Sequence, residues 1–516
     1  MAERYLVIAE VSQKQAYIFG SNKLRDNIAN SETIARITSG EYLSNFSDNL
    51  QIVSEGGGHT ILEFASREAA EVFNRKLTAH INDVYPGIEF YVKIMSYDEG
   101  SLPGDNLKEL VRLLEIKKAK RKAAFHQGTY GIEEIDRNTM LPVLVPSQNL
   151  KDEFREGDKD SEGKMSSGAD HEKLRLRNHP IPKGFVPAYK FEDLCGDNED
   201  SNFIAIIHVD GNGFGKRASD FYASVNELQW DVFRSRVRNF SDSIDDDFKD
   251  AYSLLAIEVA NSIRKKNWKS KYFPMRRVIS SGDDICFVTE GKIGIECAAR
   301  YLQILSEKVN SEDGESYPAC AGVAIVHKKF PFYKAYEISE ELCKSAKSFG
   351  AALNPSDQGK QISSIDWHIE FGEMPDTLKG IRRDYKTRDG GQLELRPFIV
   401  SAPADILEKE RIRHYEKFRK LMELIERKED GYASGKLKQM RGVLKDGEKS
   451  ARYYLKFYKI EDLAMESYHE AFEKIDVSKV KTENGLSREI FVRTQDGRMR
   501  SVLFDAIELM GNYEIL

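Results

Sequence analysis

The same order of predicted secondary structure occurs twice within the first 350 residues, and this repeat restricts the possible fold more than any other feature. The first copy begins with an apolar strand at 5–11, a largely helical stretch to about residue 46 and a hairpin with a glycine turn at 51–64. A helix at about 66–83 and a strand at about 88–97 complete the order βαββαβ. Such a unit folds into a four-stranded ferredoxin-like sheet with its helices on one face.

The second copy starts after residue 200 with FIAIIHVD at 203–210, which is as apolar as a central strand. Its other elements follow in the same order: helices over about 217–267, a hairpin at 275–290, a helix at 292–309, a strand at 317–327 and a closing helix at 331–350. After residue 400 the sequence becomes helical and highly charged. We therefore expect an α+β protein with two ferredoxin-like domains in tandem and a C-terminal helical domain.

The length of 516 residues suits about three domains. The stretch 151–175 is charged and almost free of apolar residues, which predicts a mobile loop between the two copies. We expect a first domain at 1–100, a helical and linker region at 101–200, a second domain at 201–400 and the helical domain at 401–516.

Composition and charge exclude several classes of protein. Lys and Arg number 77 against 84 Asp and Glu, so the net charge of −7 argues against non-specific binding of duplex nucleic acid. No apolar run approaches the roughly 18 residues of a membrane span, and the N-terminus does not read as a signal peptide. The five cysteines form no CxxC pair, which argues against a zinc ribbon or a disulfide framework. We expect a cytoplasmic protein with no membrane segment.

Three carboxylates are expected to meet at one edge of the second sheet. Asp210 ends the first strand of that copy, and the hairpin tip reads Ser281-Gly282-Asp283-Asp284. The first and third strands of a βαββαβ sheet are neighbours, so the three acids come together. Because like charges repel, a hard cation such as Mg²⁺ would neutralise them, and two such ions suit an in-line displacement that releases pyrophosphate. The alternative is a polar hairpin turn without chemistry.

The segment Gly211-Asn212-Gly213-Phe214-Gly215-Lys216 is not a P-loop, because no glycine stands five residues before the Gly-Lys pair and Arg217 follows it. Its small residues would let a nucleotide approach the backbone, with Phe214 packed under the sheet; a plain flexible turn is the alternative. Lys344 and Lys347 share one face of the closing helix, and we expect both to contact a nucleotide. Lys347 would reach a triphosphate at the acidic turn, and the alternative is a solvated lysine that interacts with the end of its helix.

The first copy lacks these acids. Aligning YLVIAEVS with FIAIIHVD places Ser12 at the position of Asp210, and aligning EGGGHT with SSGDD places His59 and Thr60 at the positions of the two hairpin acids. The first copy therefore cannot form the carboxylate cluster. Its glycine turn, which contains Gly57 and Gly58, would still present backbone N–H groups to a phosphate.

A strand followed by Asp-x-Asn-x-Phe-Gly and then by a Gly-Asp-Asp hairpin resembles the palm domain of the CRISPR polymerase family. This family comprises the two-palm large subunits of type III CRISPR complexes and their stand-alone relatives, within the GGDEF-like nucleotidyl cyclase superfamily. The segment 13–38 and the glycine turn are similar to the first palm of that family, so the resemblance covers about residues 1–350.

The resemblance implies two palm domains and the synthesis of cyclic oligoadenylate from ATP in antiviral signalling. In this reaction the 3′-hydroxyl of one ATP attacks the α-phosphate of another. The resemblance further implies that Asp210, Asp283 and Asp284 hold two Mg²⁺ or Mn²⁺ ions. It also implies phosphate contacts from Lys347 and nucleotide contacts from Asn212 and Phe214.

Three departures from the family pattern bear on function. Ser281 replaces the first glycine of GGDD but leaves both acids, so we expect activity to survive. No His-Asp dipeptide occurs, so DNA cleavage by the HD nuclease domain of many relatives is not expected, and zinc-binding cysteines are missing from 126–200. The chain is also short for such a subunit, which favours a stand-alone or reduced polymerase gated by a small molecule or by formation of a homo-oligomer.

Two other functions remain open. The chain would be a scaffold subunit of an RNA-guided complex if its palms mainly hold RNA and other CRISPR subunits, with the basic residues 117–122 and the helical tail as contacts. A basic run on a helix is more often a solvated face. Alternatively, the chain would be a dinucleotide cyclase that uses GTP, because base preference depends on pocket contacts that motif spacing does not reveal.

Overall fold

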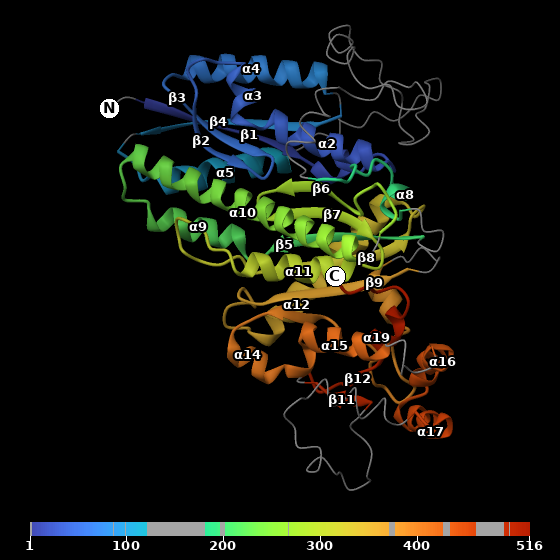
Figure 1. The fold of residues 1–516 in the computed structure, drawn as a ribbon. Helices are drawn as coiled ribbons and strands as arrows, with labels where there is room; N and C mark the ends of the chain where they lie inside the picture. Colours follow the sequence, from blue (N-terminus) through green and yellow to red (C-terminus); the bar gives the residue numbers. More distant parts are fainter. Residues whose placement is uncertain are drawn as a thin grey trace.

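The computed structural model describes residues 3–120, 181–196, 202–426, 434–460 and 490–516, without residues 86, 99, 267, 371–376 and 495. In Figure 1 the first sheet (blue) lies above the second (green to yellow), and the C-terminal elements (orange to red) lie below the second sheet. The expected loop at 151–175, like Arg121 and Lys122, lies outside the described residues. No helix among the described residues is long and apolar enough to cross a lipid bilayer.

The first sheet has four antiparallel strands in the order β2-β3-β1-β4. Buried side chains on one of its faces pack against Phe73 and Leu77 of α4, and Leu6 on the other face belongs to the core that includes Leu110 of α5. The elements are β1 (Glu3–Ser12), α1 (Lys14–Ile18), α2 (Leu24–Ile37), α3 (Gly40–Ser44), β2 (Gln51–Gly56), β3 (His59–Phe64), α4 (Arg67–Val84), β4 (Glu89–Asp98) and α5 (Pro103–Ala119).

The second sheet has six strands in the order β10-β9-β8-β5-β7-β6, and its four strands β8-β5-β7-β6 repeat the order of the first sheet. Alternate residues of β5 face opposite cores, so that Ile206 packs toward the first domain and Ile207 packs against α10 and α11. The elements are α8 (Phe191–Leu194), β5 (Phe203–Gly211), α9 (Phe214–Ser224), α10 (Trp230–Lys265), β6 (Met275–Ser281), β7 (Asp284–Glu290), α11 (Gly294–Ser306), β8 (Ala319–His327), α12 (Phe332–Leu353), β9 (Ser363–Ile369) and β10 (Phe398–Ser401).

The helix α10 connects the two sheets, as Figure 1 shows. It has 36 residues, which corresponds to a length of about 54 Å. Toward the first sheet, Ser241 donates a hydrogen bond to the carbonyl oxygen of Glu55 over 3.0 Å. Toward the second sheet, the ring of Tyr252 packs edge-on against Phe287 with centroids 5.7 Å apart. One continuous helix therefore sets the spacing between the two hairpins.

The C-terminal elements pack against the outer strands of the second sheet. Trp367 of β9 lies between Phe398 of β10 and Phe418 of α15, with ring centroids 5.3 and 4.8 Å away. The elements are α13 (Leu378–Arg382), α14 (Ala404–Lys409), the short 3-10 helix η2 (Arg411–Arg413), α15 (Tyr415–Ile425), α16 (Ser434–Lys445), α17 (Glu448–Tyr458), β11 (Phe491–Arg493), β12 (Met499–Ser501) and α19 (Phe504–Leu509).

The predicted fold class is confirmed: two βαββαβ units in tandem are followed by a largely helical part. The sequence analysis missed β9, which α12 connects to β8 as a parallel neighbour, and the hairpin of β11 and β12 in the part expected to be helical. The domain boundaries at 100, 200 and 400 stay a prediction.

Candidate active site

The structure brings the three acidic residues to one end of the second sheet. Asp210 of β5 lies directly opposite Asp284 of β7, because these strands are neighbours in the sheet. Asp283 is held next to them by its carbonyl oxygen, which accepts a hydrogen bond from the N–H of Gly211 over 3.2 Å. Gly282 has φ +64°, a left-handed conformation that favours glycine at the tip of the turn. The local turn chemistry thus places two successive carboxylates at the sheet edge.

The closing helix α12 supplies one of the two predicted lysines to this cluster. The ammonium Nζ of Lys347 lies 2.6 Å from Oδ2 of Asp210 and 2.7 Å from the carbonyl oxygen of Gly211. Burial alone would lower the pKa of Lys347, but the Asp210 carboxylate outweighs it and raises that pKa. Lys344 instead pairs with Glu340 on its own helix over 3.3 Å, and its side chain is 68% exposed. The described contacts therefore connect only Lys347 to the acids.

The two hairpin acids are protonated more easily than ordinary aspartates. Burial, together with the nearby charge of Asp210, raises the pKa of both Asp283 and Asp284 to about 7. His208 Nδ1 lies 3.5 Å from Oδ1 of Asp284, but burial lowers the pKa of this histidine to about 4, so its ring is neutral at pH 7. Above about pH 7, where both hairpin acids ionise, the cluster therefore holds more negative than positive charge.

The donor set suits a hard divalent cation. The Oδ1 atom of Asp284 is buried and accepts no hydrogen bond from a described residue. Within the described residues, no three His, Cys, Asp or Glu side chains are gathered closely enough to form a complete metal site by themselves. Mg²⁺ often takes only one or two carboxylates and completes its shell with water and substrate phosphates. The acidic turn therefore fits a cation that shares its ligands with a nucleotide.

A cavity of about 1030 Å³ separates the acidic turn from the glycine turn of the first sheet. Ser281, Asp283 and Asp284 line it on one side, and the turn 56–58 lines it on the other. Gly57 and Gly58 have φ values of +58° and +74°, so both turns adopt backbone conformations that favour glycine. The cavity is thus formed jointly by the two repeats, with the acidic turn on one side and the glycine turn on the other.

Two lysines stand near the glycine turn, and the sequence analysis assigned neither to the site. Lys14 of α1 donates a hydrogen bond to the carbonyl oxygen of Gly57, and burial lowers the pKa of this lysine. Lys118 of α5 lies 2.8 Å from Oε1 of Glu10. Lys118 belongs to the basic run 117–122, which was expected to form a solvated face or to bind RNA. Both Lys14 and Lys118 line the cavity, so part of that run faces inward.

Strand register corrects the alignment of the two copies. Glu10 lies opposite His59 in the first sheet, as Asp210 lies opposite Asp284 in the second. The hairpins close through the pairs Gly56–His59 and Ser281–Asp284. The counterparts of Asp210, Asp283 and Asp284 are therefore Glu10, Gly58 and His59. The earlier alignment to Ser12, His59 and Thr60 was wrong, because β1 continues for two residues beyond Glu10.

The first copy consequently retains one carboxylate and one lysine of the pattern. Its Glu10–Lys118 pair corresponds to Asp210–Lys347, since α5 follows β4 as α12 follows β8. Neither residue was predicted, although Glu10 would have been found by aligning the strands through their hairpins. Only one of the three corresponding residues of the first copy is acidic, so the first copy cannot form a cluster of three carboxylates at these positions.

The loop after Asp210 supports the sheet edge and is not among the residues that line the cavity. The side-chain amide of Asn212 donates to the carbonyl oxygen of Ile362 over 2.8 Å, which ties the loop to β9. Phe214 is buried, as expected, and its ring stacks on Tyr317 with centroids 6.2 Å apart. Gly213, with φ +70°, is the N-cap residue that precedes α9, and a side chain at Gly215 would point into open space.

Comparison with known proteins shows what the part of the chain that carries this geometry is similar to. Residues 203–352 match the family model described as Cas10/Cmr2, second palm domain. The segment matched runs from the first strand of the second sheet to the end of α12, and it contains all three acids and both lysines. The resemblance inferred from the motifs is confirmed by this match. None of the curated proteins matches the chain.

Solved structures share the fold over the whole chain. Csm1 of T. onnurineus is 15% identical, with 100% of this chain and 70% of that chain covered and a TM-score of 0.53. A Csm1–Csm4 cassette in complex with cA4 is 14% identical over 99% and 69% of the two chains, with a TM-score of 0.53. The cassette in complex with pppApApA is 15% identical over 98% and 68%, with a TM-score of 0.52. At these identities the likeness concerns the fold.

Proposed function

Because residues 203–352 match the family model of the Cas10/Cmr2 second palm domain, we propose that this chain is a nucleotidyltransferase that joins ATP molecules into a cyclic oligoadenylate. The observation that carries the proposal is the cavity between the two turns, with Asp283 and Asp284 on one side and the turn 56–58 on the other. The Csm1–Csm4 cassettes that share this fold were solved with cA4 and pppApApA, which supports adenylate chemistry in such a cavity.

The proposed reaction is an in-line displacement at phosphorus. The 3′-hydroxyl of one ATP attacks the α-phosphorus of another, a new P–O bond forms, and the bond to the β-phosphate breaks to release pyrophosphate. The hydroxyl gives up its proton to solvent as its oxygen attacks. Ring closure repeats the same step within one chain. Asp210, Asp283 and Asp284 would hold Mg²⁺ or Mn²⁺, which when bound supplies positive charge for the hydroxyl and the leaving pyrophosphate.

The side chains divide the remaining work. Lys347 holds the carboxylate of Asp210 at the sheet edge and adds positive charge where phosphates would lie. The backbone N–H groups of the turn 56–58 and the ammonium of Lys118 suit the phosphates of the second nucleotide at the opposite side of the cavity. The acids would hold a proton at pH below about 7 and release it when a cation binds.

The test is product analysis with each of the four nucleoside triphosphates and Mn²⁺, followed by mass spectrometry. We expect cyclic oligoadenylate and pyrophosphate from ATP, both lost in Asp283→Asn/Asp284→Asn. A matched control is Asp220→Asn/Asp231→Asn. Asp220 lies on α9 and Asp231 on α10, both are exposed, and neither lines the cavity. This control should keep wild-type turnover, which separates the loss of two charges from the loss of the site.

Other outcomes would assign one of the alternative functions. Turnover of GTP alone would identify a dinucleotide cyclase. Binding of ATP without release of pyrophosphate, also in the presence of RNA, would favour the scaffold function. That alternative is supported by the fold shared with the Csm1 subunit of the Csm1–Csm4 cassettes. We further propose that this chain binds partner subunits or forms a homo-oligomer.

A further inference from the structure

An exposed aromatic pair marks the outer surface of the C-terminal part. Tyr453 and Phe457 are 72% and 66% exposed, more than any other large hydrophobic side chain of the described residues. They lie one turn apart on α17, with ring centroids 6.3 Å apart and an interplanar angle of 23°. Burial of such rings is normally favourable, so two exposed and nearly parallel rings mark a candidate interaction surface.

Positive charge surrounds these rings. Residues 434–460 contain eight Lys and Arg but two Asp and Glu, within a chain whose net charge is −7. Lys449 and Lys456 lie on the same face of α17 as the rings, and neither forms an ion pair with a described residue. The two acids are already paired: Glu448 with Arg452 on α17, and Asp446 with Arg388 over 3.1 Å. The charge of the lysines is therefore available to a ligand.

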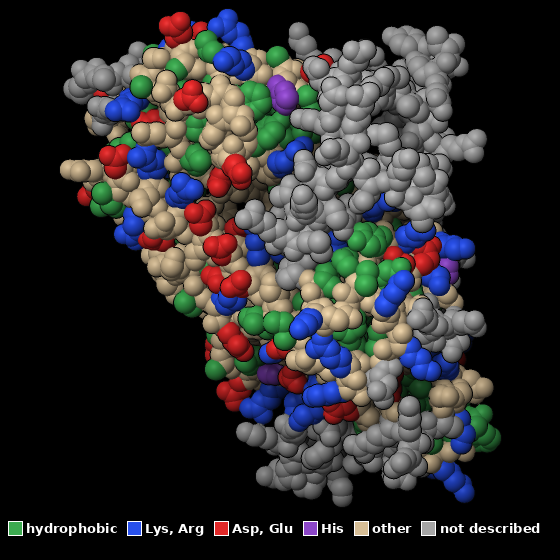
Figure 2. All heavy atoms as spheres, turned by 45° about the horizontal axis from the view of Figure 1, so that its top comes forward, with side chains coloured by type: hydrophobic (Ala, Val, Ile, Leu, Met, Phe, Trp, Pro, Cys, Tyr) green, Lys and Arg blue, Asp and Glu red, His purple; other side chains and the backbone are tan. Residues whose placement is uncertain are grey.

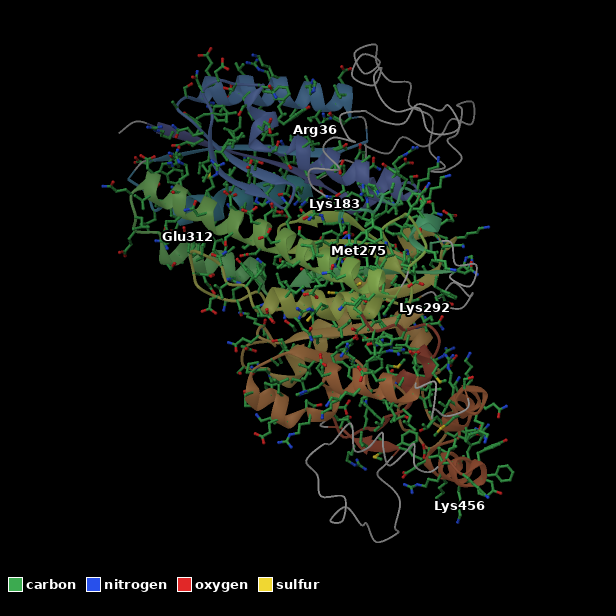
Figure 3. All side chains as sticks on the ribbon, viewed as in Figure 1. Arg36, Lys183, Met275, Lys292, Glu312 and Lys456 are labelled. Carbon is green, nitrogen blue, oxygen red and sulfur yellow. The ribbon has the colours of Figure 1, made fainter. Side chains whose placement is uncertain are left out.

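The rings border a hollow of about 400 Å³ beside α16. Its lining includes Lys449, Tyr453, Tyr454 and Phe457, so a planar group placed there meets aromatic faces and an ammonium together. Figure 3 places Lys456 on the part of α17 farthest from the two sheets. At the lower right edge of Figure 2, where α17 lies, hydrophobic and basic side chains stand side by side on the surface.

We propose that Lys449, Tyr453, Lys456 and Phe457, the α17 patch, bind single-stranded nucleic acid by base stacking and phosphate contacts. Stacking platforms for single strands combine exposed aromatic rings with a positively charged track, whatever the base sequence. Protein–protein interfaces are instead depleted in lysine at their core. The lysines beside the rings therefore favour a nucleic acid over a second protein. This inference does not depend on the proposed reaction.

The test is fluorescence anisotropy of the full chain with labelled 20-nucleotide oligouridylate and oligothymidylate. We expect Tyr453→Ala/Phe457→Ala to weaken binding by about tenfold or more, since each stacked base contributes about 1–3 kcal/mol. Lys449→Gln/Lys456→Gln should lower the slope of log affinity against log salt by about 0.7 for each lysine. All four positions are exposed, so thermal unfolding of these variants should stay close to that of the wild type.

Matched controls keep the test specific. Leu254→Ala/Ile257→Ala removes two exposed apolar side chains of α10, and Arg75→Gln/Lys76→Gln removes two exposed cations of α4. Both should bind like the wild type. Equal affinity for the two oligonucleotides, or preference for RNA, would each support the proposal. Binding that is absent in the wild type, or unchanged in both α17 variants, would overturn it and leave the patch to a protein or to another segment of this chain.

Discussion

The ammonium group of Lys347 lies 2.6 Å from the carboxylate of Asp210, at the edge of the second sheet where Asp283 and Asp284 also stand. No described lysine or arginine forms such a pair with the other two acids. Among the described ion pairs, Lys347 thus neutralises Asp210 directly and leaves the two hairpin acids without a lysine or arginine partner. The position of Lys347 on α12 makes that helix part of the site, although its first residue lies 122 positions beyond Asp210 in the sequence.

Replacing Lys347 should reduce turnover strongly. We expect Lys347→Met to lower kcat by about 100-fold or more, as is typical for the loss of one charged group at a reacting phosphate or oxyanion. Lys347→Arg should retain part of the activity, because the charge remains. Initial rates of pyrophosphate release measure the effect. Lys334→Met, on the same helix but paired with Glu337, is the matched control and should be nearly silent.

For Lys344, the expectation from the sequence and the geometry in the structure differ. The sequence analysis placed it in the nucleotide site, whereas the structure pairs it with Glu340 and leaves it 68% exposed. We expect Lys344→Met to change kcat/KM by less than about threefold, because a surface pair contributes about 0–1 kcal/mol. A loss comparable to that of Lys347→Met would show that Lys344 reaches the nucleotide.

The two hairpin acids should make the protein less stable as the pH rises. Burial raises the pKa of each from 3.8 to about 7, so between these values the folded state binds more protons than the unfolded state. The free energy of unfolding therefore falls from about pH 4 to about pH 7 and levels off above it. Urea unfolding in metal-free buffer measures this decline as the difference between the wild type and Asp283→Asn/Asp284→Asn. A difference that does not vary with pH would contradict the assignment.

Divalent cations should reverse this loss of stability. Their binding requires ionised carboxylates, so Mn²⁺ should raise the thermal midpoint more at pH 8 than at pH 6. At a concentration of 100 times Kd the expected stabilisation is about 2.7 kcal/mol. Differential scanning fluorimetry with Mn²⁺ or Mg²⁺ measures the shift. The Asp283→Asn/Asp284→Asn variant should show none, and a full shift in that variant would place the cation elsewhere.

The glycine turn offers a test of the opposite side of the cavity. Gly58 has φ +74°, and a Cβ atom there would lie 2.7 Å from the side chain of Lys14. Gly87 has φ +97° but no atom within 4 Å of such a Cβ. Each change to alanine should cost about 1 kcal/mol of folding free energy through the backbone. Only Gly58→Ala should also weaken ATP binding, as measured by calorimetry. Equal ATP affinity of the two variants would exclude the glycine turn from the nucleotide-binding site.

A buried arginine joins the C-terminal part to the second sheet. Arg396 is inaccessible to solvent and lies 2.8 Å from Asp505 and 2.7 Å from Glu508 of α19. Removing it leaves two buried acids without their main cation, so Arg396→Met should lower the free energy of unfolding by about 3–5 kcal/mol. Arg388→Met, whose side chain is 83% exposed, should cost less than about 1 kcal/mol. Urea denaturation compares the two variants.

The repeat pattern predicted the order of strands and the meeting of Asp210 with the hairpin acids, because strand adjacency in a βαββαβ unit follows from the order of elements. It could not predict the register of the first sheet. Register depends on hydrogen bonds between strands that are distant in sequence, and the alignment through Ser12 therefore missed Glu10.

The inward-facing lysines were hidden for a related reason. Lys118 stands in a basic run that looks like any solvated helix face, and its partner Glu10 lies 108 residues earlier. The strand β9 was not predicted because the βαββαβ repeat is complete before α12, and a four-stranded unit does not require another strand. The sequence did not predict that Tyr453 and Phe457 of α17 are exposed, because an amphipathic pattern alone does not show which side chains of a helix reach solvent.

The unequal turns give the cavity a direction. Carboxylates stand at the turn of one repeat, whereas the corresponding positions of the other repeat are Gly58 and His59. The two halves of the duplicated fold are thus not interchangeable, and two identical ATP molecules bound there would have different fates. An oligonucleotide assembled in this cavity would grow in one direction only. Every new bond would form beside the acidic turn, and the glycine turn would only bind the other nucleotide.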